Sequence, residues 1–160
     1  MKIVVIGIGN EIQGDDGLGV HVIKELERIS LPKEVKLLAG GTSGPDLIVY
    51  FEGVDLLIFV DAIRGGNEPG TMYKYNPEEM KYQRSVALSP HQIGIPETLR
   101  LAEFADKKPK KSVFFGMEPM NLDFSMELSQ PLKEKLPRLV ELIVEEIDSF
   151  LASNKDQNIL

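Results

Sequence analysis

The sequence predicts an α/β protein, a three-layer α/β/α sandwich around a mostly parallel five-stranded sheet with one antiparallel strand. Apolar runs typical of strands alternate along the chain with segments of helical periodicity, an order that favours a sheet covered by helices on both faces. Two runs, residues 3–8 and 56–60, are continuously apolar, as expected for strands buried on both sides. Residues 71–75 follow the preceding strand too closely for a helical crossover, so we expect this strand to be antiparallel.

The individual elements follow from local patterns along the chain. Apolar, β-branched or alternating segments indicate five strands, over residues 3–8, 35–39, 56–60, 71–75 and 112–117. Apolar side chains at helical spacing predict helices between Leu18 and Pro32, over 46–51, over 97–105 after Pro96, and from Leu132 to Leu151. Pro137 lies inside the last helix and is expected to kink or restart it.

Length and composition indicate one globular domain. The chain has 160 residues, 42% of them hydrophobic and 27% charged, so we expect a single domain over 1–153 and a frayed polar tail over 154–160. Because 25 acidic residues outnumber 18 basic ones, we expect no nucleic-acid partner, and we interpret the basic run 107–111 as a solvated loop. No apolar run approaches about 18 residues, so we expect no membrane span and a cytoplasmic location. The absence of cysteine excludes thiolate metal sites and cysteine nucleophiles.

The glycine-rich loop after the first strand does not match a nucleotide-binding motif. Its spacing is Gly7-x-Gly9 followed by Gly14, which fails the G-x-G-x-x-G pattern at the third glycine, and no Gly-Lys-Ser/Thr follows. Asp15 and Asp16 would also place negative charge where a phosphate needs positive potential. These acids suit a helix N-terminus or a cation instead.

Three side chains that can bind a metal each follow a predicted strand or lie in a loop. Asp16 comes after the first strand, Asp61 ends the third, and His91 is one of only two histidines. Ligands of open α/β sheets bind outside the carboxyl ends of strands, so this triplet predicts a cation site. Oxygen and imidazole donors without thiolates suit nickel, zinc or manganese, and three protein ligands would leave coordination positions open for a substrate.

Each of these residues also has a simpler interpretation. Asp15 or Asp16 is expected to cap the first helix. Asp61 could hold a turn, and a single histidine is more often an ordinary hydrogen-bonded residue than a ligand. The other histidine, His21, lies five residues beyond Asp16, a helical spacing that points it away from Asp16, so we assign it no role.

Several motifs together resemble those of the maturation endopeptidases of [NiFe] hydrogenases, which remove a C-terminal extension from the hydrogenase large subunit. The motifs occur in family order and span about three quarters of the chain: Gly7-x-Gly9-Asn10, Gly14-Asp15-Asp16-Gly17-x-Gly19, Gly40-Gly41-Thr42, Val60-Asp61-Ala62, Pro69-Gly70-Thr71, Ser89-Pro90-His91-Gln92 and Gly116-Met117-Glu118-Pro119. Any one of them would be weak, but the set is specific.

The resemblance implies a substrate, a metal and a set of site residues. It implies that Asp16, Asp61 and His91 meet nickel already inserted into the large-subunit precursor, so that nickel signals complete metallation. It also implies that Gly40, Gly41 and Thr42 form a loop that contacts the precursor. The cofactor would thus be nickel supplied by the precursor, although another divalent ion could occupy the free site.

One departure from the family pattern bears on the mechanism. Several relatives carry an acid directly before Gly-Gly-Thr, whereas this chain has Ala39, so a carboxylate at that position cannot take part. Two mechanisms remain: a divalent ion polarises the scissile carbonyl or activates water, or Asp16 or Asp61 acts as the general base. Two other functions are also open, a nickel-checking assembly factor without catalysis and a metal-dependent hydrolase of small peptides. A monomer is expected, because no extra apolar stripe is evident in the sequence.

Overall fold

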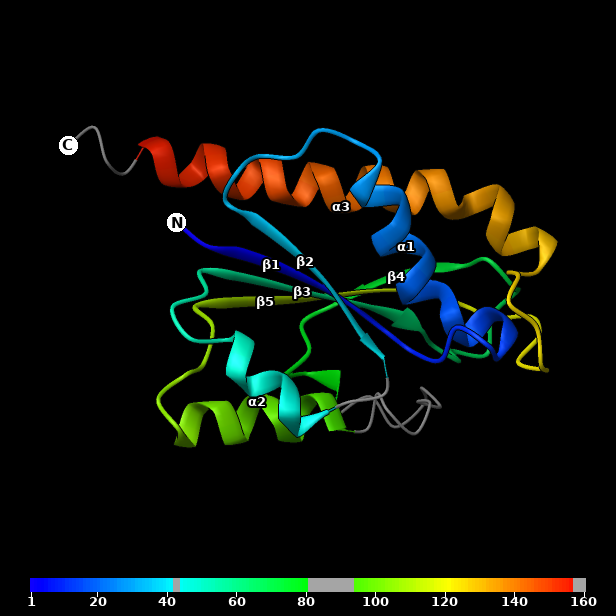
Figure 1. The fold of residues 1–160 in the computed structure, drawn as a ribbon, viewed down its shortest axis with the longest axis horizontal. Coiled ribbons are helices and arrows are strands. Elements are labelled where there is room, and N and C mark those ends of the chain that lie inside the picture. Colours follow the sequence, from blue (N-terminus) through cyan, green and yellow to red (C-terminus); the bar gives the residue numbers. More distant parts are fainter. Residues whose placement is uncertain (42–43, 81–93, 157–160) are drawn as a thin grey trace.

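The computed structural model describes residues 1–41, 44–80 and 94–156 and contains one five-stranded sheet between two helical layers (Figure 1). The strand order is β2-β1-β3-β5-β4, with the bounds β1 Ile3–Ile8, β2 Val35–Gly41, β3 Leu56–Ala62, β4 Met72–Tyr75 and β5 Lys111–Met117. Neighbouring strands pair in parallel except β4, which pairs antiparallel with β5. The predicted fold class is therefore confirmed.

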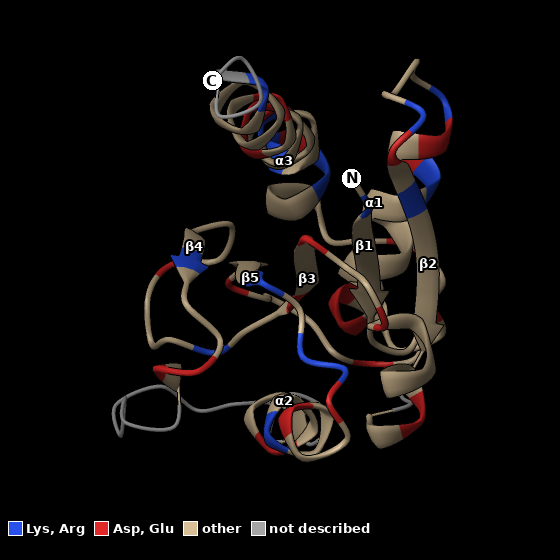
Figure 2. Cartoon of the chain, turned by 90° about the vertical axis from the view of Figure 1, so that its left-hand side faces the viewer, with Lys and Arg blue, Asp and Glu red and all other residues tan. Residues whose placement is uncertain are grey.

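Two helices cover each face of the sheet. The helices α1 (Leu18–Glu27) and α3 (Gln130–Asp156) lie on one face, and α2 (Gly94–Phe104) and the short 3-10 helix η2 (Pro45–Tyr50) lie on the other (Figures 1 and 2). The central strands alternate their side chains between these layers. In β3, for example, Ile58 and Val60 pack toward α1 and α3, whereas Leu57 and Phe59 pack toward α2 and η2.

Element boundaries differ from the predictions in ways that reflect local chemistry. The segment expected as a helix over 46–51 is a 3-10 helix that begins at Pro45. The last helix continues unbroken through Pro137, which is exposed, so water can satisfy the carbonyl group that a backbone N–H would otherwise contact. That helix also runs to Asp156, so the first three residues of the predicted frayed tail are helical. No helix within the described ranges is long and apolar enough to cross a membrane.

The topology creates a crevice between β1 and β3. The chain leaves β1 through α1 to reach β2 on one side, and it later returns to β3 on the other side of β1. Ligands of open α/β sheets bind at such a switch point, outside the carboxyl ends of the strands. Asp61 lies at the end of β3, and Asp16 lies in the short 3-10 helix η1 (Gly14–Gly17) after β1.

Candidate functional site

The two predicted acidic site residues are buried side chains at this switch point. Asp16 is 4% exposed and Asp61 is fully buried. The backbone N–H of Asn10 donates a 3.0 Å hydrogen bond to Asp16 Oδ2, and the N–H of Ala62 donates a 2.7 Å bond to Asp61 Oδ1. Both carboxylates are thus oriented by the main chain directly after the strands that carry them.

Gly9 brings the two acids together. Its φ of +120° lies in the region that favours glycine, and it sits where the chain turns out of β1. A β-carbon at this position would lie 1.8 Å from the carbonyl oxygen of Asp16 and 3.2 Å from Asp61 Oδ1. Only a glycine therefore lets the main chain of η1 approach the end of β3 this closely.

The end of β2 borders the same region. The register between β1 and β2 shifts between Gly7 and Ile8, so Gly40 is an extra residue and Gly41 turns with a φ of +55°. The N–H of Gly9 donates a 2.8 Å hydrogen bond to the carbonyl oxygen of Gly41. The structure thus places Gly40 and Gly41 at the end of β2 rather than in the predicted loop, and Gly41 is bonded to Gly9. Thr42 lies outside the described residues, and contact of this segment with a precursor stays a prediction.

A shallow pocket of about 340 Å³ opens beside this turn, lined by Gly9, Asn10, Glu11, Val20, Ala39 and Gly41. Ala39 contributes an exposed methyl group to its wall, where a longer acidic side chain would reach over the turn. Among the lining residues the only carboxylate is that of Glu11, which forms an ion pair with Lys24. The site therefore depends on Asp16 and Asp61 for its carboxylates.

The third predicted ligand, His91, lies outside the described residues, so its position relative to the two acids is a prediction. It precedes α2 by three residues in the sequence, and α2 covers the face of β3 that Asp61 shares with Leu57 and Phe59. Within residues 1–41, 44–80 and 94–156, no group of three or more acidic or histidine side chains could hold a metal ion. The described part of the site thus supplies two carboxylates.

Comparison with known proteins decides the family of this chain. A family profile described as hydrogenase maturation protease matches residues 20–146. The chain is 34% identical over 144 residues to the hydrogenase expression/formation protein HupD of Bradyrhizobium diazoefficiens, covering 88% of this chain and 75% of that protein. It is also 34% identical over 146 residues to the hydrogenase 2 maturation protease of Escherichia coli K12, covering 90% and 89% of the two chains. This chain belongs to the hydrogenase maturation protease family.

Solved structures of such proteases share the fold. The maturating endopeptidase HybD from Escherichia coli superposes with a TM-score of 0.85 at 32% identity, over 93% of each chain. The maturation protease HybD from Thermococcus kodakarensis gives a TM-score of 0.77 at 27% identity, over 92% of this chain and 99% of that one. The resemblance inferred from the motifs is confirmed.

Asp15 has a different structural role in this maturation protease from the one that its position in the sequence predicted. Neither Asp15 nor Asp16 caps its own helix with its side chain. Asp15 is instead fully buried against the start of α3, where Oδ1 accepts a 2.7 Å hydrogen bond from the N–H of Ser129. Its Oδ2 accepts bonds from the Ser129 hydroxyl and from the N–H groups of Met120 and Asn121. Asp15 therefore holds the loop between β5 and α3 against η1.

Glu118 is a site-supporting residue to which sequence reasoning assigned no role. It is 6% exposed, and its Oε2 accepts hydrogen bonds from the N–H of Gly65 at 2.6 Å and from the hydroxyl of Tyr73 at 2.7 Å. Burial raises the pKa of Tyr73, and the neighbouring Glu118 carboxylate raises it further. These bonds fix the loop that follows Asp61. The Glu-Pro pair in the last motif was the available signal, because Glu118 directly follows the apolar strand β5.

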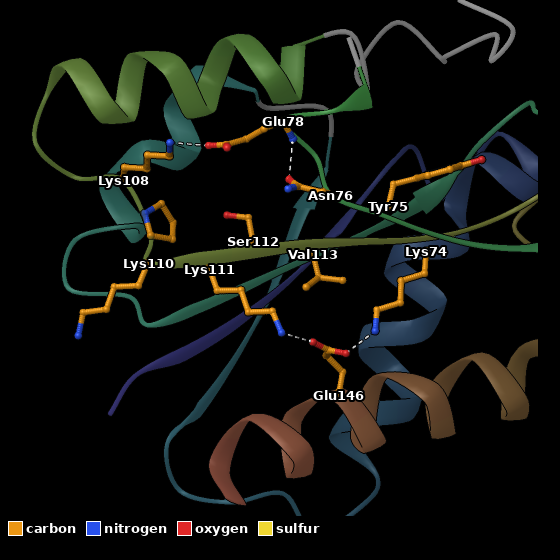
Figure 3. Close-up of a pocket in the computed structure, with 11 residues that line it drawn as sticks. Lys74, Tyr75, Asn76, Glu78, Lys108, Lys110, Lys111, Ser112, Val113 and Glu146 are labelled. Carbon is orange, nitrogen blue, oxygen red and sulfur yellow. Dashed lines mark hydrogen bonds and ion pairs between the residues drawn. The ribbon is translucent and has the colours of Figure 1, made fainter. Parts of the chain in front are cut away.

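A larger pocket of about 520 Å³ lies elsewhere, between β4, β5 and α3 (Figure 3). It includes Lys111 at the start of β5, whereas Asp61 pairs with Gly116 near the other end of that strand. These two positions along β5 are separated by roughly 16 Å, given about 3.3 Å per residue. The larger cavity is therefore separate from the two acids.

Proposed function

We propose that this protein is an endopeptidase that removes the C-terminal extension of a [NiFe]-hydrogenase large-subunit precursor after nickel insertion. The observation that carries the proposal is the pair of buried acids Asp16 and Asp61, both of which lie against the Gly9 turn at the switch point of a maturation-protease fold. Peptide hydrolysis requires a group that removes a proton from water, and a fixed carboxylate can do this. The proposal makes the protein a partner of the precursor, acting as a monomer in the cytoplasm.

Nickel enters this proposal as part of the substrate. A divalent cation bound by Asp16 and Asp61 would balance the negative charge of the two carboxylates. With His91 as a third donor, Asp16 and Asp61 would form a set of oxygen and nitrogen ligands that suits nickel, leaving further positions for ligands from the precursor. We expect nickel in the precursor to be recognised by these three side chains, and a divalent ion held there can also act as a Lewis acid toward the scissile carbonyl.

In this proposal the two acids and the β2 turn have separate tasks, which the geometry of the described residues supports. Asp16 is anchored by the N–H of Asn10, and Asn10 lines the open pocket, so we expect the incoming substrate to pass close to Asp16. Asp61 is fully buried at the strand end, which suits a fixed ligand or a base that acts on a water molecule. Gly40 and Gly41 end an edge strand, where an extended segment of the precursor could pair with exposed main chain.

The test is to mix the purified protein with a hydrogenase large-subunit precursor, with and without nickel, and to measure intact masses. We expect a nickel-dependent loss of a C-terminal peptide. The variants Asp16→Ala and His91→Ala should abolish this loss, whereas His21→Ala, which changes the other histidine, should retain it. Equal cutting of a nickel-free precursor would refute the recognition role of nickel. A stable complex without mass loss would instead indicate a non-catalytic assembly factor.

A further inference from the structure

Four exposed apolar side chains gather on two loops next to the candidate site. Ile12 follows β1, and Met120, Phe124 and Met126 lie in the loop between β5 and α3; their exposed fractions are 44%, 63%, 83% and 60%. Nine large hydrophobic side chains of the described residues are at least 44% exposed, and these four fall on two short segments. We call this set the apolar rim.

The two loops of the apolar rim form one unit. The N–H of Ser125 donates to the carbonyl oxygen of Ile12 at 2.9 Å, and the N–H of Gly14 donates to the carbonyl oxygen of Ser125 at 2.8 Å. A β-carbon at Gly14 would lie 2.7 Å from the carbonyl oxygen of Asn121, so the loops touch main chain to main chain. Figure 1 shows the β5–α3 loop, in yellow, beside the blue segment that follows β1. The surface is therefore preformed.

The apolar rim is continuous with the carboxylate site. The N–H of Ile12 donates to the side chain of Asn10, whose own N–H binds Asp16 Oδ2. A protein that presents a peptide to Asp16 thus passes within a few residues of the rim. Two acids around the rim are paired, Glu11 with Lys24 and Glu127 with Lys133, so the exposed surface is bordered by compensated charges.

We propose that the apolar rim is the surface on which the large-subunit precursor docks, through an apolar segment of that precursor next to its cleavage site. This inference rests on the proposed function. Exposed apolar clusters bordered by polar groups mark protein interaction sites. Methionine adapts its shape to a partner at low cost, and phenylalanine supplies a large, rigid apolar contact. A second copy of this chain would be a competing occupant. Pairing of two copies through the rim would cover Asn10 and the approach to Asp16, so a substrate is the better fit.

A pair of matched phenylalanine variants tests the docking role. Phe124→Ser removes the most exposed side chain of the rim, and Phe104→Ser removes a 94% exposed phenylalanine at the far end of α2. Neither side chain supports the core, so both variants should unfold at the wild-type temperature. We expect Phe124→Ser to raise the Kd for the nickel-loaded precursor roughly tenfold to thirtyfold with kcat at saturation retained, and Phe104→Ser to leave both unchanged.

Other outcomes separate this inference from the proposed function. Equal affinity of the wild type, Phe124→Ser and Met120→Ser for a precursor that all three cleave would overturn the docking surface and leave the proposed function intact. Equal weakening by Phe124→Ser and Phe104→Ser would also overturn it. A wild-type dimer that Phe124→Ser dissociates without changing the Kd would assign the rim to a second copy. Conversely, a precursor that binds through the rim but is never cut would contradict only the proposed endopeptidase activity.

Discussion

The two ends of the sheet differ in how their charged side chains are placed. At the carboxyl end, Asp16 and Asp61 are buried and accept hydrogen bonds from the main chain. At the other end, the large pocket is lined by lysines that pair with acids near solvent, such as Lys111 with Glu146 at 2.9 Å and Lys108 with Glu78 at 2.5 Å (Figure 3). The carboxyl end has the smaller pocket and the more costly arrangement of charge.

Under the proposed function, the candidate active site is the end of the sheet with the smaller pocket, and the larger cavity is separate from it. Exposed ion pairs contribute little energy and are easily exchanged for water, so the large pocket needs no functional explanation. Buried titratable groups at a strand end are more often functional than exposed ion pairs, which makes Asp16 and Asp61 the better candidates. Four predictions sharpen the contrast.

The largest effect should come from removing one charge at the carboxyl end. Asp16→Asn and Asp61→Asn keep the shape of each side chain but remove a base and a ligand, so kcat/KM for precursor cleavage should fall roughly 10²- to 10⁴-fold. At the other end, Lys111→Gln should leave kcat/KM within about twofold of the wild type, since Lys111 lies at the start of β5, far from the residue that pairs with Asp61. Mass spectrometry of timed reactions measures both. Near-normal cleavage by the two aspartate variants would remove them from the mechanism.

Gly9 is the backbone counterpart of that prediction. Gly9→Ala would force alanine to adopt a φ of +120°, and its β-carbon would lie 1.8 Å from the carbonyl oxygen of Asp16. We therefore expect the substitution to destabilise the protein by more than about 3 kcal/mol. Gly66→Ala is the matched control, because Gly66 also has a positive φ, +79°, yet none of the described atoms lies within 4 Å of its added β-carbon. Its cost should be about 1 kcal/mol. Urea unfolding distinguishes the two, and equal costs would show that the close approach at Gly9 is unimportant.

Much of the fold could be predicted because its signals are local. The apolar runs of β1 and β3 and the short connection before β4 determined the layers and the antiparallel strand. Strand ends were harder to predict from the sequence. The strand β2 continues through Gly40 and Gly41, although the low β-propensity of glycine alone predicts a loop there. Pairing with β1 and the register shift extend that strand, and both are tertiary effects.

The site was predictable only in part. Asp16 and Asp61 follow from their positions after strands, but Asp15, its neighbour, was expected to cap a helix and instead binds a loop more than 100 residues away in the chain. The apolar rim was missed entirely, since Met120, Phe124 and Met126 occur in a polar segment with no periodic pattern. Contacts between distant loops decide both features.

Asp15→Asn tests whether Asp15 has a structural role that differs from the proposed catalytic role of its neighbour Asp16. In Asp15→Asn an amide NH2 group, which is a donor, replaces one of two carboxylate oxygens that both accept hydrogen bonds, so we expect a loss of roughly 2–4 kcal/mol in the free energy of unfolding. Asp123→Asn, an exposed change in the same loop, should cost less than about 0.5 kcal/mol. Cleavage by folded Asp15→Asn should exceed that by Asp16→Asn. The reverse order would assign Asp15 to the chemistry.

The smallest effect belongs to Glu146, which binds Lys74 and Lys111 at the opposite end and is only 9% exposed. Burial alone would raise the pKa of Glu146, but the hydrogen bonds from Lys74 and Lys111 outweigh it and hold the pKa below the ordinary value of 4.5. The folded state therefore binds this proton less readily than the unfolded chain. The resulting stability is present above about pH 4.5 and is lost as the pH falls through the lowered pKa.

Glu146→Gln should consequently lower stability by about 1 kcal/mol at pH 7 and by less at pH 3, without changing precursor cleavage. Glu145→Gln, the adjacent residue on α3 whose exposed carboxylate binds Arg138 at 3.2 Å, should have a smaller effect at either pH. Thermal unfolding at the two pH values measures the difference. A loss of cleavage in Glu146→Gln at pH 7 would show that the large pocket takes part in the function, because the variant changes charge there and nowhere near Asp16 or Asp61.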